Sequence, residues 1–121
     1  MSKQVQVALL LTGNELMSGD TVDSNSSRIA LALGAHKIGV GKKITVGDDP
    51  ILLSDSLMDL CASADVVIIN GGLGPTEDDL TAELVAEVAG QALVNHPSAI
   101  EHLEEWCERR GLELNASNLK P

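Results

Sequence analysis

The chain has 121 residues, the length of a single domain, and contains no Phe, no Tyr and one Trp, so its core must be aliphatic. Its formal net charge of −10, from 8 basic and 18 acidic residues, opposes binding to nucleic acid or to an anionic membrane surface. The sequence contains no apolar run as long as a membrane span and does not begin like a signal peptide, so we expect a cytoplasmic protein.

The first part of the chain predicts two strands with a helix between them. Residues 5–11 are almost continuously apolar, which is typical of a strand buried on both faces. Residues 12–21 are predicted as a loop, and a helix over residues 24–33 follows and ends at Gly34. Residues 38–46 predict a second strand, which its glycines and lysines place nearer the edge of the sheet.

The middle of the chain predicts a helix and a third strand. A turn over residues 47–50 begins the helix, with Pro50 near the first helical position. One apolar stripe runs along this helix and consists of Leu53, Leu57, Leu60, Cys61 and Ala64. Residues 66–69 are apolar without interruption, as in a central strand.

Two further helices are predicted after the third strand. The first ends at Gly90 and is lined by Leu80, Leu84 and Val88. The second begins at Pro97, ends at Gly111 and faces inward with Ile100, Leu103 and Cys107. Neither cysteine has metal-ligand spacing, so we expect both to be buried or half-buried thiols in a reducing cytosol.

The alternation of strands and helices predicts an α/β fold with a parallel sheet and right-handed crossovers. Strands one and three are expected side by side, in the order 2-1-3. No segment after the third strand has the pattern of a partner strand. We therefore expect a single domain over residues 1–121 that is incomplete at its carboxyl end, or whose free edge another subunit covers.

Three glycines and three consecutive carboxylates follow the third strand, within residues 70–81. The backbone of such a loop can approach a phosphate closely at its glycines, which are Gly71, Gly72 and Gly74. Asp78 and Asp79 are candidate ligands for a divalent cation, so the loop predicts a phosphate-bearing ligand handled with a metal ion. The alternative is a tight structural turn, because Thr76 and Asp79 match the helix-capping pattern.

Polar and acidic side chains also follow the first two strands. Glu15, Asp23 and Asn25 follow the first, and Asp48 and Asp49 follow the second. Because parallel strands end at one edge of a sheet, we expect these groups to meet the glycine loop there. The alternative is that the group around Asp23 caps one helix and that the two adjacent aspartates supply charge at the start of the next. The three histidines are scattered and show no metal-ligand pairing.

Three motifs together resemble the N-terminal domain of CinA proteins. They are Thr12-Gly13-Asn14-Glu15-Leu16 with Gly19 and residues 22–25, then residues 45–48, then residues 71–81. CinA is the competence/damage-inducible family, part of the wider MoaB/Mog-like molybdopterin-binding superfamily. Residues 116–120 resemble a segment that reads Ser-Asn-Arg-Lys-Gln in this family.

The resemblance implies a three-layer α/β/α sandwich with a mostly parallel sheet and a site for a pterin or nucleotide pyrophosphate. In CinA-type domains it implies metal-dependent hydrolysis of ADP-ribose to AMP and ribose 5-phosphate, with Mg²⁺, Mn²⁺ or Co²⁺. The positions that would be catalytic are Asp48 and Asp79, and the metal ligands would be Asp78 and Asp79. The ligand-binding positions would be Gly13, Glu15, Asn25, Gly71, Gly72, Gly74, Thr76 and Thr81.

Three functions therefore remain open: a pyrophosphatase, a binding module or inactive remnant, and a molybdopterin adenylyltransferase. Asp78 argues against the last, because the Mog-like branch usually carries Arg there. Two departures from the family pattern are Asn14, where many relatives carry Asp, and Asp49, where Asn is usual. Because few Lys or Arg residues are expected near the loop, the pyrophosphatase requires a metal.

The nicotinamide mononucleotide deamidase of longer CinA proteins belongs to a separate C-terminal domain that has no match here. The free strand edge favours a homodimer.

Overall fold

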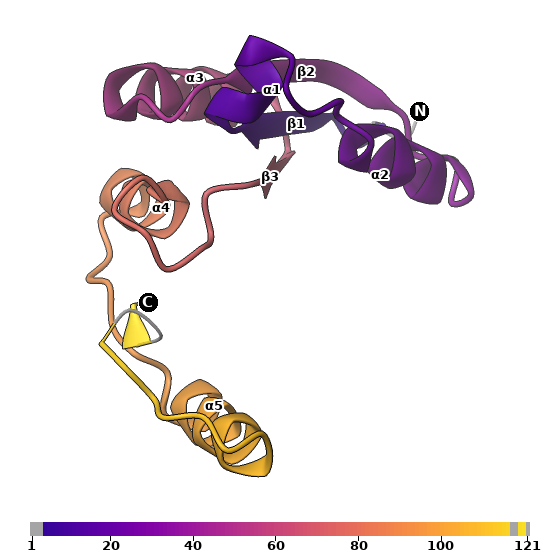
Figure 1. Cartoon of the computed structure of the whole chain (residues 1–121). Coiled ribbons are helices and arrows are strands. Elements are labelled where there is room, and N and C mark those ends of the chain that lie inside the picture. The colour runs from indigo at the N-terminus through magenta and orange to yellow at the C-terminus, as the bar shows by residue number, and fades with distance from the viewer. Residues whose placement is uncertain (1–3, 117–118, 121) are drawn as a thin grey trace.

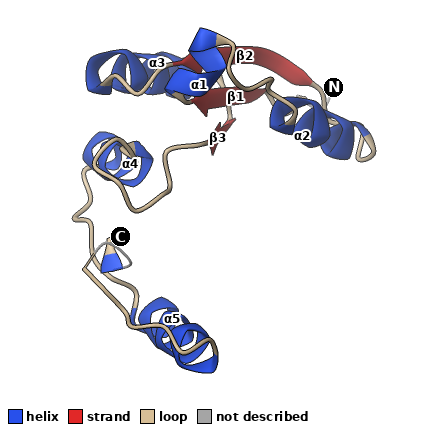
Figure 2. Ribbon diagram, in the orientation of Figure 1, coloured by secondary structure: helices blue, strands red, loops and turns tan. Residues whose placement is uncertain are grey.

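The computed structural model describes residues 4–116 and 119–120, which form a small parallel sheet with helices around it (Figures 1 and 2). The strands are β1 (Val7–Thr12), β2 (Val40–Val46) and β3 (Val66–Asn70). The helices are α1 (Asn14–Ser18), α2 (Asn25–Gly34), α3 (Pro50–Ser63), α4 (Thr81–Ala89) and α5 (Pro97–Arg109). Among the described residues, no helix is long and apolar enough to cross a membrane. Ser117 and Asn118 of the segment that resembles Ser-Asn-Arg-Lys-Gln, and Pro121 after it, lie outside the described residues.

The sheet has the order β2-β1-β3 with both strand pairs parallel, which confirms the predicted order 2-1-3. All six residues of β1 are buried, because a central strand of aliphatic residues is covered on both faces. β2 lies at one edge, as its lysines and glycines predicted. Within the described part of the chain β3 pairs with β1 alone, so it forms the other edge, and Val66 at its start is 46 % exposed.

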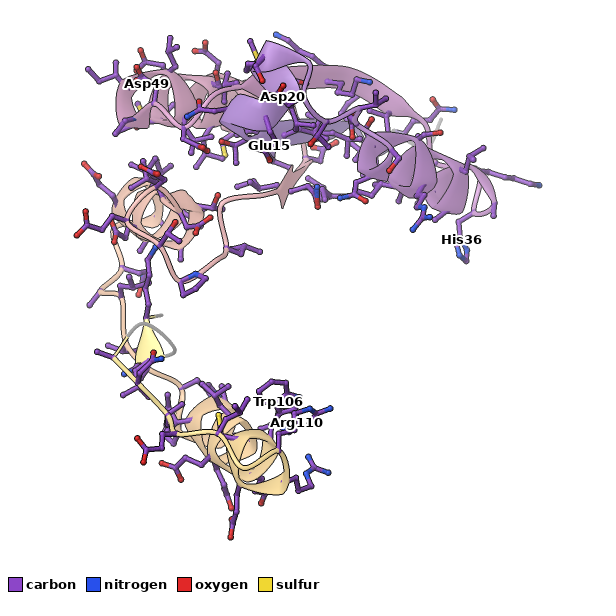
Figure 3. All side chains as sticks on the ribbon, viewed as in Figure 1. Glu15, Asp20, His36, Asp49, Trp106 and Arg110 are labelled. Carbon is purple, nitrogen blue, oxygen red and sulfur yellow. The ribbon has the colours of Figure 1, made fainter. Side chains whose placement is uncertain are left out.

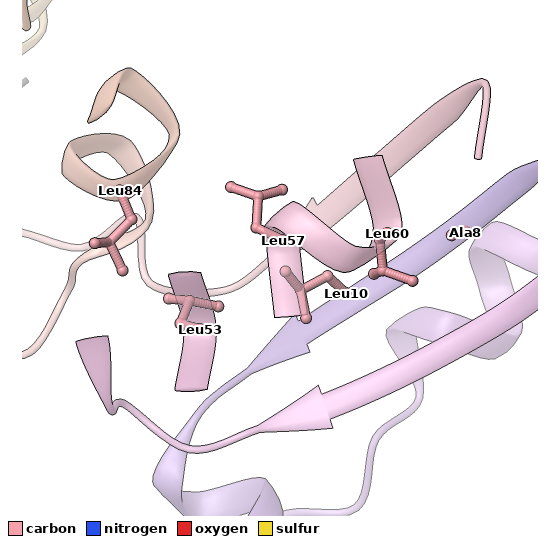
Figure 4. Close-up of a cluster of buried hydrophobic side chains, with 6 residues drawn as sticks. All are labelled: Ala8, Leu10, Leu53, Leu57, Leu60 and Leu84. Atoms are coloured by element: carbon pink, nitrogen blue, oxygen red, sulfur yellow. The ribbon is translucent and has the colours of Figure 1, made fainter. Parts of the chain in front are cut away.

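The hydrophobic core lies on one face of the sheet and is entirely aliphatic (Figure 4). Its buried members are Ala8 and Leu10 from β1, Leu53, Leu57 and Leu60 from α3, and Leu84 from α4. Successive strand residues point to opposite faces, so Leu9 faces away from this core. There it lines a hollow together with Ser26 and Ala30 of α2. Helices α2 and α3 therefore cover opposite faces of the sheet, which gives the three layers of an α/β/α fold.

Two predictions about the segments before β3 are wrong. The loop expected over residues 12–21 contains the short helix α1, which lies between Gly13 and Gly19 and has too few residues to show an apolar period. Cys61 is exposed, although it was assigned to the buried stripe. Its neighbour Leu60 is fully buried, and one residue along a helix turns the side chain by about 100°, which carries Cys61 to the edge of the stripe.

The last helix does not join the core. Cys107 of α5 is buried and Ile100 and Leu103 are half-buried, but Figure 1 shows α5 standing apart from the sheet. The guanidinium of Arg110 lies 4.3 Å from the ring centre of Trp106, one helical turn earlier. Val88, expected to line α4, is also exposed, because only the first part of that helix packs against α3 through the core residue Leu84.

Candidate functional site

The loop between β3 and α4, residues 71–80, is shaped by two glycines in the left-handed backbone region. Gly71 has a φ of 109° and Gly72 a φ of 66°. A Cβ atom on Gly71 would lie 2.3 Å from the carbonyl oxygen of Thr12, and one on Gly72 would lie 2.3 Å from Oγ1 of Thr81. Both glycines therefore allow the chain to pack closely on itself, against the end of β1 and the start of α4.

Thr81 fastens this β3–α4 loop to the helix that follows it. Its hydroxyl donates a hydrogen bond to the carbonyl oxygen of Gly71 at 2.6 Å, and its backbone N–H donates to the carbonyl oxygen of Gly72 at 3.2 Å. Thr81 is 5 % exposed, so its hydroxyl is buried and stabilises the interior of the loop.

Asp79 closes a turn inside the same loop. One carboxylate oxygen accepts hydrogen bonds from the hydroxyl of Thr76 at 2.7 Å and from its backbone N–H at 3.1 Å. These two bonds stabilise the charged form and lower the pKa of Asp79. A Cβ atom on Gly74 would lie 2.6 Å from this carboxylate. The capping-type pair of Thr76 and Asp79 thus forms, but in a turn that precedes α4, and Asp78 lies exposed in that turn.

A second group of polar contacts, the Asp48 cluster of Thr12, Asn14 and Asp48, joins the ends of β1 and β2. The carboxylate of Asp48 accepts hydrogen bonds from the hydroxyl of Thr12 and the backbone N–H of Asn14, both at 3.3 Å. The side-chain oxygen of Asn14 accepts one from the backbone N–H of Asp48 at 2.9 Å. Because the carbonyl of Thr12 faces Gly71, Thr12 connects this cluster to the β3–α4 loop, and the ends of all three strands meet.

Two other candidate acids, Asp49 and Asp23, cap helices, which is the alternative that the sequence left open for them. Asp49 caps α3 by accepting hydrogen bonds from the backbone N–H groups of Ile51 at 2.9 Å and Leu52 at 3.0 Å. Asp23 accepts hydrogen bonds from the hydroxyl and the backbone N–H of Ser26 at the start of α2, and these bonds lower its pKa. Both carboxylates therefore complete helix N-termini.

Glu15 and Asn25, the remaining candidates near the first strand, are both exposed. Glu15 lies on α1 and folds back over Gly13, since a Cβ atom there would come within 2.5 Å of its carboxylate. Figure 3 shows Glu15 beside the sheet, whereas His36 lies beyond the end of α2. Asn25 is the first residue of α2, and its backbone N–H donates a hydrogen bond to the carboxylate of Asp23.

Lys120 is a residue of the site that the sequence did not single out. Its ammonium donates hydrogen bonds to the carbonyl oxygens of Gly74, at 3.4 Å, and of Thr76 and Asp79. One cationic side chain therefore lies at this loop, where few were expected. The signal was present, because Lys120 belongs to the segment over residues 116–120 that resembles Ser-Asn-Arg-Lys-Gln.

The side chains at this edge do not form a metal site by themselves. Over residues 4–116 and 119–120, no three or more His, Cys, Asp or Glu side chains converge as metal ligands would. The carboxylate of Asp79 is engaged by Thr76, and that of Asp48 by Thr12 and Asn14. This donor set does not fit a divalent cation held by the protein alone.

Comparison with known sequences agrees with the resemblance to CinA proteins. The family model described as "Probable molybdopterin binding domain" matches residues 8–113. A CinA-like protein of Colwellia psychrerythraea is 52 % identical over 95 % of this chain, which covers 27 % of that protein. A Shewanella oneidensis protein named nicotinamide-nucleotide amidohydrolase PncC is 37 % identical over 96 % of this chain and 27 % of its own length. The chain thus spans about a quarter of these relatives.

Comparison with solved structures points the same way. CinA from Thermoplasma acidophilum, a protein described as of unknown function, superposes with a TM-score of 0.82 at 30 % identity. That match covers 98 % of this chain and 69 % of the other. The molybdopterin biosynthesis enzyme MoaB from Thermus thermophilus has a TM-score of 0.69 at 21 % identity, covering 97 % of this chain and 71 % of MoaB. The second match supports the fold alone.

Proposed function

Because the chain belongs to the molybdopterin-binding-domain family and, within it, to the CinA-like proteins, we propose that it binds a nucleotide or pterin pyrophosphate at the carboxyl edge of its sheet. The observation that carries this proposal is the double role of Thr12. Its hydroxyl contacts Asp48 and its carbonyl faces Gly71, so the Asp48 cluster and the β3–α4 loop form one continuous edge. Ligands of open α/β sheets bind at such edges.

The first candidate reaction is hydrolysis of ADP-ribose to AMP and ribose 5-phosphate. Water adds to one phosphorus atom while the P–O bond to the bridging oxygen breaks. The chain's own part would be to receive the pyrophosphate at the β3–α4 loop and to orient the cation bound to it with the carboxylates of Asp48 and Asp79. Since these side chains do not fit a resident cation, we take the substrate to be the ADP-ribose complex of Mg²⁺, Mn²⁺ or Co²⁺. The cation would also reduce the repulsion between the pyrophosphate and a chain of net charge −10.

The second candidate is a binding module without turnover. It is favoured by the engagement of the Asp79 carboxylate with Thr76, which occupies the group that would orient a substrate. We propose neither adenylyl transfer, which Asp78 argues against, nor the amidohydrolase activity named in the Shewanella relative, of which this chain covers only 27 %.

We expect the chain to bind Mg²⁺–ADP-ribose, and Asp48→Ala to weaken that binding by about tenfold or more, because it removes a carboxylate that attracts the bound cation and accepts hydrogen bonds from Thr12 and Asn14. Titration calorimetry measures the affinity, and chromatography of the products detects AMP. Asp55→Asn, on the exposed side of α3, is the matched control and should bind as the original chain does.

Each result separates the candidates. AMP that forms with a divalent cation and disappears in Asp79→Ala supports the hydrolase. Binding without AMP supports the module. If neither ADP-ribose nor inorganic pyrophosphate binds with any of the three cations, the proposed function is wrong.

We also propose a cytoplasmic homodimer that pairs through the free edge of β3. Its support is the pairing of β3 with β1 alone in the described chain and the 46 % exposure of Val66. Light scattering after gel filtration should give twice the chain mass, and Val66→Lys should shift it to the monomer, because a charge blocks edge pairing. Val22→Lys, at an exposed loop position, should leave the dimer intact. A monomeric original chain would contradict the proposal.

A further inference from the structure

Lys120 links two parts of the chain that are distant in sequence. Its ammonium hydrogen-bonds to three carbonyl groups of the β3–α4 loop, and the one on Thr76 lies 44 residues earlier. The rest of Lys120 and its neighbour Leu119 line a hollow against α5, together with Ile100 and Leu103. Lys120 thus connects the region of α5 to the candidate site.

The direction of these hydrogen bonds also determines where the neighbouring backbone N–H groups of the loop point. In a trans peptide the carbonyl and the following N–H point in opposite directions. Because Lys120 draws the carbonyls of Thr76 and Asp79 toward itself, the N–H groups of Glu77 and Leu80 point away from it. These N–H groups therefore point outward from the turn, where each could donate a hydrogen bond to an oxygen of an anionic ligand.

The charge of Lys120 has a second effect. The loop carries three consecutive carboxylates, Glu77, Asp78 and Asp79, which repel one another and any anionic ligand. An ammonium bonded to the carbonyls of the same turn offsets this repulsion where a phosphate would arrive. After the hydrogen bonds from Thr76, the charge of Lys120 also contributes to the lowered pKa of Asp79.

We propose that Lys120 is a positioning residue for the phosphate-bearing ligand. It holds the turn over residues 76–79 so that the N–H groups of Glu77 and Leu80 face the ligand, and it supplies positive charge beneath them. The inference rests on the proposed function for the identity of the ligand, but the hold of Lys120 on the loop can be measured without any ligand.

The test compares Lys120→Met, which keeps the stem but removes the charge and donors, with Lys120→Arg, which keeps both. Lys42→Met, at an exposed position of β2, removes the same charge elsewhere. We expect Lys120→Met to weaken binding of Mg²⁺–pyrophosphate by about tenfold or more, as for other hydrogen bonds to charged groups. Lys120→Arg should restore most of the affinity, and Lys42→Met should leave it unchanged. Affinity at the original level in Lys120→Met would overturn the inference.

A ligand-free readout separates this inference from the proposed function. Hydrogen exchange at the amides of residues 76–80 should accelerate in Lys120→Met, and the pKa of Asp79, followed by carbon NMR, should rise. Both should return toward the original in Lys120→Arg. If the original chain binds no pyrophosphate, the proposed function fails, and these measurements decide the role of Lys120 alone. Unchanged exchange and an unchanged pKa in Lys120→Met would exclude the positioning role.

Discussion

Replacing Leu60 with alanine is expected to lower the free energy of unfolding by about 2–5 kcal/mol, the range for large-to-small substitutions in a packed core. Leu60 is 0 % exposed and belongs to the cluster that joins α3 to Leu10 of β1. Since the core contains no large aromatic residue that could shift to fill the cavity, we expect a cost above the lower limit. Chemical denaturation followed by circular dichroism measures it.

The matched control lies on the same helix. Leu52 is 54 % exposed, so Leu52→Ala removes the same atoms from a site that water already reaches. We expect it to cost less than about 1 kcal/mol. Equal losses for the two substitutions would mean that α3 does not bury the face assigned to it.

Replacing Gly72 with alanine is expected to cost about 2–5 kcal/mol, from left-handed backbone strain of about 1–2 kcal/mol and overpacking of about 1–3 kcal/mol. The overpacking arises because the new Cβ would lie 2.3 Å from Oγ1 of Thr81, whose hydroxyl holds the carbonyl of Gly71. The loop would then have to move. Denaturation gives the stability, and calorimetry with Mg²⁺–ADP-ribose should show weaker binding.

Gly90 provides a control with almost the same backbone. Its φ of 67° matches the 66° of Gly72, but a Cβ atom there would meet nothing within 4 Å. Gly90→Ala should therefore show the strain alone, and the difference between the two substitutions, about 1–3 kcal/mol, measures the close contact with Thr81. No difference would show that this contact does not constrain the loop.

The fold was largely predictable because its signals are local. The continuous apolar run of β1 indicated a strand buried on both faces, and Gly90 and Pro50 marked the ends of helices correctly, whereas the similar run of β3, read as central, lies at an edge of the described sheet. The inward face of α5 was predicted correctly, since Ile100, Leu103 and Cys107 are its only residues that are not exposed, but the apolar period does not show which partner covers that face.

The site was predictable in outline only. Asp48 and Asp49 are adjacent acids after the same strand, yet one joins Thr12 and the other caps α3. The proline at position 50 was a usable signal, since a residue just before a first-turn proline is the natural cap. The bonds of Lys120 had no local pattern, because they join segments 41 to 46 residues apart.

Because the site depends on the position of Thr12, it can assemble only when β1 is correctly aligned with its neighbouring strands. If β1 slid by one residue against its neighbours, Leu11 or Gly13 would replace Thr12 at the junction, and neither side chain has a hydroxyl for Asp48. The contact between Asp48 and Thr12 therefore exists only in the native alignment of β1. The proposed binding edge can therefore be complete only in a chain whose strands are correctly paired.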